Sequence, residues 1–213
     1  MTTIVCFGDS NTYGTPGMPG PDFWGRFGPA ERWPGVMRAA LGAGFDVIEE
    51  ALPGRTTVHD DPIEGRDRNG LTALPIMLGS HRPIDLVIVM LGTNDLKARF
   101  SVTPADIAAS VGVLGRAVQA SPAGPDGRAP KVLVVAPSLI EEVGFLGQMF
   151  AGGAAKSREL GPAFAAVAKR FGVPCLDAAP IIRVDPTDGI HLHADQHAIL
   201  GRAVAEAARA ALA

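Results

Sequence analysis

Five short runs of mostly Val, Ile, Leu, Ala and Phe recur along the chain, and most of them are apolar at nearly every position. Continuous rather than alternating hydrophobicity indicates strands that are buried on both faces, as in a parallel sheet covered by helices. This pattern therefore predicts a parallel sheet between two helical layers. The runs span residues 3–8, 45–51, 84–91, 131–136 and 173–177.

The segments between these runs have the length and composition of helices. Strands that alternate with helices are typical of a doubly wound α/β fold, here a three-layer α/β/α sandwich with a five-stranded parallel sheet. With 213 residues, 47% of them hydrophobic, the chain is expected to form one domain over residues 1–213. The predicted helices span residues 33–41, 70–81, 104–119, 154–170 and 195–211.

Charge and cysteine content narrow the range of partners and compartments. The formal net charge is −3 and Lys and Arg form no cluster, which argues against nucleic-acid binding. Cys6 and Cys175 resemble small buried hydrophobes rather than a disulfide framework. No basic leader with a long apolar stretch follows Met1, and no apolar stretch has membrane-spanning length. We expect a cytoplasmic protein that binds a small molecule and no membrane.

A serine, Ser10, directly follows the first apolar run. In a doubly wound sheet the reacting groups lie at the carboxyl ends of the strands. A serine at a strand-to-helix turn there exposes its Oγ, while its own N–H points toward developing negative charge. The alternative is that Ser10 only caps a helix.

An Asp-x-x-His pair, Asp188 and His191, precedes the last predicted helix. Asp188 can reach Nδ1 of His191 while Nε2 faces Ser10, which supplies the orienter, base and nucleophile of acyl transfer. The alternative is a helix start with Asp188 as a cap and His191 half exposed. His193 and His197 compete as the base, but neither has an Asp three residues earlier. We interpret both as surface or supporting residues.

Two candidate oxyanion donors follow the second and third apolar runs. Asn94 follows the most hydrophobic run and carries a side-chain amide, and Gly54 allows close approach to its backbone N–H. Taken singly, each segment is equally consistent with an ordinary turn. Their placement after successive strands favours a shared site with Ser10.

These residues resemble the SGNH, or GDSL-type, hydrolases, a family named after a Ser, a Gly, an Asn and a His in four sequence blocks. All four occur here in order, as Ser10, Gly54, Asn94 and His191, and the resemblance spans the whole chain. Asn11 stands where the GDSL name has Leu, a position that many relatives vary.

The resemblance implies a flavodoxin-like SGNH hydrolase fold and a serine esterase that needs no cofactor and no metal. It implies that Ser10 is the nucleophile, His191 the base and Asp188 its orienter. The oxyanion hole would consist of the N–H groups of Ser10 and Gly54 and the Asn94 amide. The resemblance also implies supporting roles for two neighbouring carboxylates, Asp9 and Asp95.

Further segments are similar to bacterial arylesterases that also act as acyltransferases. Such relatives hydrolyse small acyl esters, some transfer the acyl group to alcohols or peroxide, and they assemble as oligomers. The resemblance therefore implies a homo-oligomer. Tyr13 and Thr15 stand where that branch carries a tryptophan-rich entrance, which implies a more open, polar approach and hydrolysis as the main activity. The similar segments are residues 31–33, 47–50, 54–57, 60–62, 90–95 and 150–153.

The expected substrates are short, acetyl-type esters of aryl or alkyl alcohols. Aromatic residues in the long connections 15–32 and 137–153 either wall an apolar pocket, pack the loops or form subunit contacts. They are Phe23, Trp24, Phe27, Phe145 and Phe150. The residues expected to line the substrate pocket are Asn11, Tyr13, Phe150 and Ile190.

Three other functions are consistent with parts of the pattern. A carbohydrate acetylesterase would use the same residues. A noncatalytic α/β domain would use Ser10 and Asn94 to hold a small anion or sugar, but would not need the Asp-x-x-His pair. A metal hydrolase would draw on His191, His193 and Asp195, with Asp9 contributing, but the chain has no His-Glu-x-x-His run or paired Cys spacing.

Overall fold

The computed structural model describes residues 1–213 and is built on one five-stranded sheet in which every neighbouring pair is parallel. The strand order is β2-β1-β3-β4-β5, so the chain moves outward from β1 to β2 and then crosses β1 to continue at β3. This reversal is the topological switch point at which doubly wound sheets bind ligands. The strands are β1 (Thr2–Gly8), β2 (Phe45–Ala51), β3 (Leu86–Met90), β4 (Lys131–Ala136) and β5 (Cys175–Asp177).

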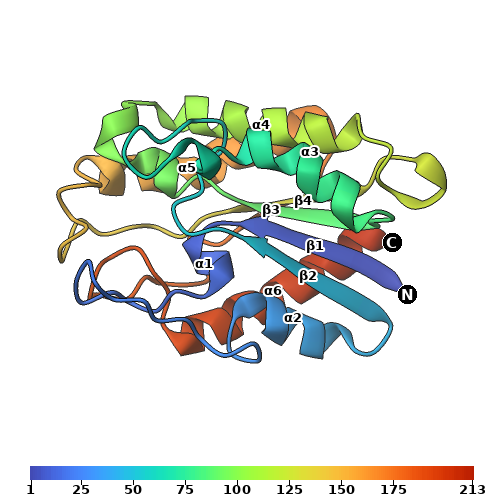
Figure 1. The fold of residues 1–213 in the computed structure, drawn as a ribbon, viewed down its shortest axis with the longest axis horizontal. Helices are drawn as coiled ribbons and strands as arrows, with labels where there is room; N and C mark the ends of the chain where they lie inside the picture. Colours follow the sequence, from blue (N-terminus) through green and yellow to red (C-terminus); the bar gives the residue numbers. More distant parts are fainter.

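Helices cover both faces of the sheet (Figure 1). One face carries α2 (Trp33–Leu41) and α6 (Ala194–Leu212). The other carries α3 (Gly70–His81), α4 (Pro104–Gln119) and α5 (Gly153–Phe171). The three-layer α/β/α sandwich that the sequence predicts is therefore confirmed.

The strands are buried on both faces because successive side chains point in opposite directions. In β1, Val5 and Phe7 belong to the apolar cluster under α3, α4 and α5, whereas Ile4 and Cys6 belong to the cluster under α2 and α6. This double burial explains why the sequence shows continuous apolar runs rather than alternation.

Local signals set the ends of the helices. Thr103 and Asp106 form a reciprocal capping box at the start of α4, with Pro104 in its first turn. The α5 helix ends at Gly172, whose φ of 66° places it in the left-handed region that glycine tolerates best. Every predicted helix forms within one residue of its expected bounds.

The predicted strands are also present, although two are shorter than expected. The run 84–91 forms a strand only over Leu86–Met90, because the N–H of Ile84 bonds to the carbonyl of Ala123, outside the sheet. The run 173–177 forms a strand over Cys175–Asp177. Short helical turns complete the chain: α1 (Ser10–Tyr13) and 3-10 turns at Arg66–Arg68, Asn94–Leu96, Ala98–Phe100 and Pro125–Gly127.

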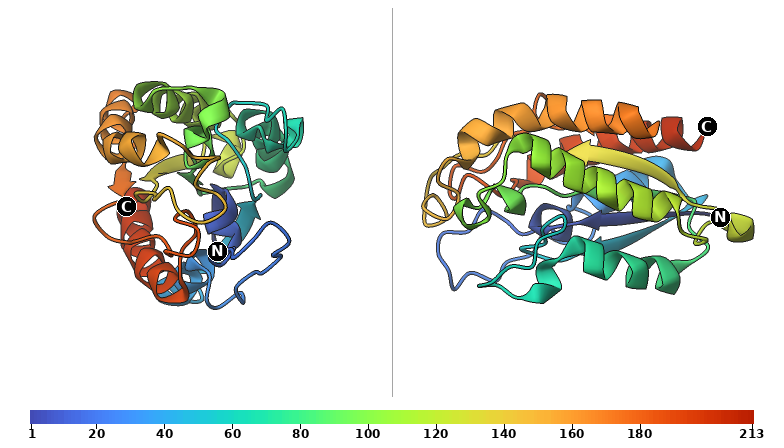
Figure 2. Two further views of the ribbon diagram at one scale, coloured as in Figure 1. Left: turned by 90° about the vertical axis from the view of Figure 1, so that its left-hand side faces the viewer. Right: turned by 90° about the horizontal axis from the view of Figure 1, so that it is seen from above.

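The carboxyl ends of the strands, α1 and the long connections gather at one end of the molecule (Figures 1 and 2). Both termini lie at the opposite end (Figure 1). Residues distant in sequence therefore meet at the end that carries the loops. None of the helices combines the length and apolar character needed to cross a bilayer.

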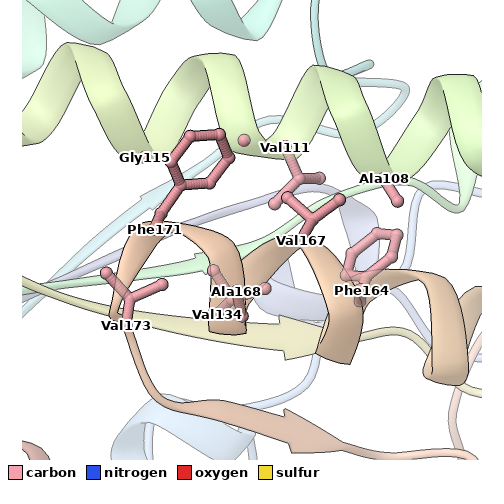
Figure 3. Close-up of a pocket in the computed structure, with 10 residues that line it drawn as sticks. Ala108, Val111, Gly115, Val134, Phe164, Val167, Ala168, Phe171 and Val173 are labelled. Carbon is pink, nitrogen blue, oxygen red and sulfur yellow. The ribbon is translucent and has the colours of Figure 1, made fainter.

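A cavity of about 10 Å³ lies between α4 and α5, with Val134 of β4 among the residues that line it (Figure 3). Its walls include Val111, Phe164 and Phe171, and it is no larger than the space a single water needs. We interpret it as a packing gap between the two helices.

Helices α2 and α6 approach closely at Gly201. A Cβ at this position would stand 2.6 Å from the Cβ of Val36 and 2.7 Å from the carbonyl oxygen of Trp33. Both distances are shorter than normal van der Waals contact. The backbone of α2 would have to move to admit any side chain.

We expect Gly201→Ala to lower the free energy of unfolding by about 1–3 kcal/mol, because the added methyl overpacks this helix contact. The matched control is Gly79→Ala in α3, where a Cβ would meet nothing within 4 Å. That change should raise stability by about 0.5–1 kcal/mol, since alanine loses less backbone entropy in a helix. Urea unfolding of both variants measures the two changes in the free energy of unfolding. Changes of the same sign would contradict the prediction.

Candidate active site

Three polar side chains form one hydrogen-bonded row at the end of β1. Nε2 of His191 lies 3.0 Å from Oγ of Ser10, and Nδ1 of the same ring lies 2.6 Å from Oδ2 of Asp188. Ser10 is the first residue of α1, and Asp188 and His191 lie on the turn before α6. His191 is 181 residues from Ser10 in the sequence. The three side chains are buried. This is the geometry of a nucleophile, a general base and the group that orients the base.

Asp188 is held as a carboxylate by several donors. Its Oδ1 accepts the N–H groups of Ile190 and His191, at 2.9 and 3.0 Å, and its Oδ2 accepts the N–H of Met18 at 2.7 Å. Burial alone would raise the pKa of Asp188, but the hydrogen bond and charge of His191 and these N–H groups outweigh it and lower the pKa. An ionised Asp188 fixes which ring nitrogen of His191 faces Ser10.

The turn that carries His191 is tied to two other parts of the chain. Asn11 in α1 donates its amide Nδ2 to the carbonyl of Ile190 at 3.0 Å. In the loop after β4, Glu141 donates its N–H to the carbonyl of Gly189 at 2.8 Å. Gly189 has a φ of 72°, and a Cβ there would collide with the carbonyl of Glu141. The turn is therefore fixed independently of the His191 side chain.

Asp9 caps α1 beside the hydrogen-bonded row. Its carboxylate accepts the N–H of Asn11 at 3.0 Å and forms no ion pair. Burial raises the pKa of Asp9 to about 6, because one N–H donor and the more distant charges of His191 and Arg55 only partly offset the loss of water.

Two donors stand on the loops that follow β2 and β3, the neighbours of β1. Asn94 donates one amide hydrogen to the carbonyl of Arg55 at 3.1 Å, which leaves the second hydrogen free. The N–H of Gly54 has no acceptor within the protein, and its φ of 79° requires a left-handed backbone. Arg55 also donates to the carbonyl of Gly8 at 3.1 Å, so the loop after β2 is attached to the end of β1.

Asp95 joins the same two loops. It accepts the backbone N–H of Thr57 at 3.0 Å and the hydroxyl of the same residue, and Nε2 of His59 lies 3.8 Å away. Burial raises the pKa of Asp95, with the Thr57 hydrogen bonds acting in the opposite direction. Asp95 thus connects the loops without reaching Ser10 through any hydrogen bond.

The structure places the four residues predicted to line a substrate pocket in different surroundings. Phe150 and Ile190 are buried in the apolar core between the sheet and α3–α5, and the Asn11 amide is occupied by the turn before α6. Tyr13 is half-buried, and the guanidinium of Arg26 covers its ring at 3.8 Å.

The loop aromatics also separate from one another. Trp24 is 92% exposed and Phe145 is 38% exposed, whereas Phe27 packs edge-on against His197 with ring centroids 5.3 Å apart. The five aromatics therefore form no single wall beside Ser10.

The competing histidines take different places. His193 is exposed and pairs with Asp195 at 3.0 Å, as expected for a surface residue. The surface interpretation of His197 is wrong, because this residue is fully buried and accepts the N–H of Trp33 at 3.3 Å. Burial lowers the pKa of His197 to about 4. No group of three or more His, Cys, Asp or Glu is arranged to hold a metal ion.

Comparisons with known proteins show which families and structures the chain resembles. Residues 6–199 match the profile of the GDSL-like lipase/acylhydrolase family. The chain is 44% identical to the aryl esterase of M. smegmatis, covering 99% of this chain and 100% of that one, with a TM-score of 0.93. It is 43% identical to a carbohydrate acetylesterase from Sinorhizobium meliloti, covering 99% of each chain, with a TM-score of 0.93. No curated protein sequence is significantly similar to the chain.

The raised pKa of Asp9 makes stability depend on pH. The folded carboxyl keeps its proton to about pH 6, whereas the unfolded one releases it near 3.8, so the wild type loses stability as pH rises through this window. Asp9→Asn keeps an N-cap but cannot ionise. We expect the difference in free energy of unfolding, Asp9→Asn minus wild type, to increase by up to about 3 kcal/mol between pH 4 and pH 7. Urea unfolding at several pH values tests this, and parallel curves would refute it.

Proposed function

The chain belongs to the GDSL-like lipase/acylhydrolase family and is a carboxylic ester hydrolase, and from this premise we propose that Ser10 is its nucleophile. The observation that carries the proposal is the unbroken row from Asp188 through His191 to Ser10, with separations of 2.6 and 3.0 Å. A capping serine or a ligand-binding serine needs no such base. We therefore assign Ser10, His191 and Asp188 as the catalytic triad.

In the proposed reaction Oγ of Ser10 attacks the ester carbonyl carbon while Nε2 of His191 takes the hydroxyl proton. The tetrahedral intermediate then collapses, the carbon–oxygen bond to the alcohol breaks, and His191 gives its proton to the departing oxygen. Water attacks the acyl-enzyme with His191 again as base, and the acid leaves from Ser10. The Asp188 carboxylate stabilises the imidazolium that forms in each half-reaction.

The negative oxygen of the intermediate needs donors already in position. We propose that these are the N–H groups of Ser10 and Gly54 and the free amide hydrogen of Asn94. Three facts support this: Ser10 is the first residue of α1, the Gly54 N–H has no protein acceptor, and Asn94 uses only one amide hydrogen internally. Asp9 and Asp95 act as supporting residues.

We propose short acyl esters of aryl or alkyl alcohols as substrates, with acyl transfer as a side activity. The printed names of similar structures support an aryl esterase and, as the second candidate, a carbohydrate acetylesterase. The second candidate also gains support from two charged side chains next to Gly54. These side chains, Glu64 and Arg68, suit a polar alcohol group. We propose Tyr13 as the pocket residue nearest the opening, because it is half-buried one turn after Ser10.

Three further features belong to the same proposal. A single catalytic domain is supported by one continuous sheet between two apolar clusters. A cytoplasmic location is supported by two cysteines that are both free. Homo-oligomer assembly is supported by apolar side chains exposed on the loops, including Trp24 and Ile63.

The first experiment compares turnover of p-nitrophenyl acetate by the wild type and by Ser10→Ala, with folding of both checked by circular dichroism. We expect the variant to lose about 10⁴-fold or more in kcat, because nucleophile and base act as a unit. The same two proteins are assayed on an acetylated sugar. A higher kcat/KM on the sugar would favour the carbohydrate acetylesterase, and equal activity of both proteins would replace the serine mechanism with ligand binding or another reaction.

We expect Asn94→Ala to lower kcat by about 10²–10³-fold with little change in KM, the behaviour of a donor used mainly in the transition state. Steady-state kinetics on p-nitrophenyl acetate measure both constants. An effect confined to KM would instead assign Asn94 to ground-state binding of the substrate.

A further inference from the structure

A buried ionic cluster lies beside Gly54, outside the triad. The side chain of Lys97 is only 2% exposed, and its Nζ lies 2.5 Å from Oε1 of Glu64 and 3.5 Å from Oδ2 of Asp61. Arg99 completes the cluster, 2.9 Å from Asp61 and 3.7 Å from Glu64. Two cations and two carboxylates thus connect the loop after β2 with the loop after β3.

Asp61 is fully satisfied without Lys97. It accepts the backbone N–H groups of Ile63 and Glu64, and Nη1 of Arg99 contacts both of its oxygens, at 2.9 and 3.2 Å. Burial opposes ionisation of this carboxyl, but these donors and the Lys97 charge lower its pKa to about 2. Arg99 is thus the closer counter-ion of Asp61, whereas the closest ionic contact of Lys97 is to Glu64.

Glu64 is in direct contact with the proposed oxyanion donor. While Oε1 faces Lys97, Oε2 occupies the space that a Cβ on Gly54 would take. The Glu64 side chain is 30% exposed. A carboxylate at this place repels the negative oxygen that develops near the Gly54 N–H in the transition state. The charge of Glu64 must be compensated for the oxyanion to form readily.

Lys97 comes from the loop that carries the other side-chain donor. It follows Asn94 by three residues, and its N–H donates to the Asn94 carbonyl at 3.2 Å. The Lys97–Glu64 ion pair therefore connects the turn that carries Asn94 with the backbone at Gly54.

We propose that Lys97 is a positioning residue of the ester hydrolase. Lys97 neutralises the charge of Glu64 and holds that carboxylate against Gly54. This contact keeps the Gly54 N–H and the Asn94 amide in position relative to each other, and Lys97 itself does not touch the substrate. The inference rests on the proposed function, because it needs Gly54 and Asn94 to bind an oxyanion. A purely structural ion pair would predict a loss of stability but no charge-dependent change in kcat.

The test is the kcat and KM of Lys97→Met, Glu64→Gln and the double variant on p-nitrophenyl acetate, at a temperature well below every melting point. We expect Lys97→Met to lower kcat by about 10–100-fold with little change in KM, because it removes the closer of the two cations at Glu64 and leaves that carboxylate beside the oxyanion with only Arg99, at 3.7 Å. Adding Glu64→Gln removes that charge and should restore kcat at least tenfold, and Lys97→Arg should retain most of the activity. A double variant no more active than Lys97→Met, or a Lys97→Met with wild-type kcat, overturns the proposal.

Two controls complete the design. Lys131→Met removes a lysine that is bonded to the carbonyl of Leu212 at the far end of the molecule, and it should leave kcat unchanged. If Lys97→Met does not fold, Lys97→Gln keeps a hydrogen-bond donor without the charge and is expected to lower kcat with the same rescue by Glu64→Gln. Ser10→Ala in the same assay separates the two hypotheses: activity without Ser10 refutes the proposed function, whereas Ser10-dependent activity insensitive to Lys97 refutes only this inference.

Discussion

The parallel pairing of β1 with both β2 and β3 is the constraint on which the site depends. Gly8 at the end of β1 lies level with Ala51 of β2 and Met90 of β3, so the three strands finish side by side. The next few residues of each chain segment, which include Ser10, Gly54 and Asn94, are brought to one edge by backbone hydrogen bonds alone. Short turns follow the strands: Asp9 caps the first of them, and Asp95 joins the loops after β2 and β3.

Two buried carboxylates beside Ser10 show how local donors decide charge. Asp188 accepts three backbone N–H groups and faces the ring of His191, and its pKa falls. Asp9 accepts one N–H and has no ion pair, and its pKa rises to about 6. The same functional group is thus held ionised beside the proposed base, and is more easily neutralised where it caps a short helix.

The elements that could be predicted from the sequence are those with a period or a fixed spacing. The apolar runs predicted every strand, and the Asp-x-x-His pair predicted that Asp188 and His191 would meet Ser10 once the sheet placed their turns at one edge. Loop paths have no comparable period, so the N–H of Met18 as a partner of Asp188 and the contact between Lys97 and Glu64 were not predictable. The surface alternative for His197 was wrong for a related reason: its partners Phe27 and Trp33 come from another part of the chain.

The hydrogen bond between Asn11 and the carbonyl of Ile190 joins the first turn of the chain to the last turn before α6. Ser10 and His191, the proposed nucleophile and base, are separated by 181 residues, so a ribosome synthesises the one long before the other. At 5–20 residues per second this interval is roughly 10–40 s. Throughout it the nascent chain carries Ser10 without His191, so a site that needs both residues can form only after nearly the whole polypeptide has been synthesised.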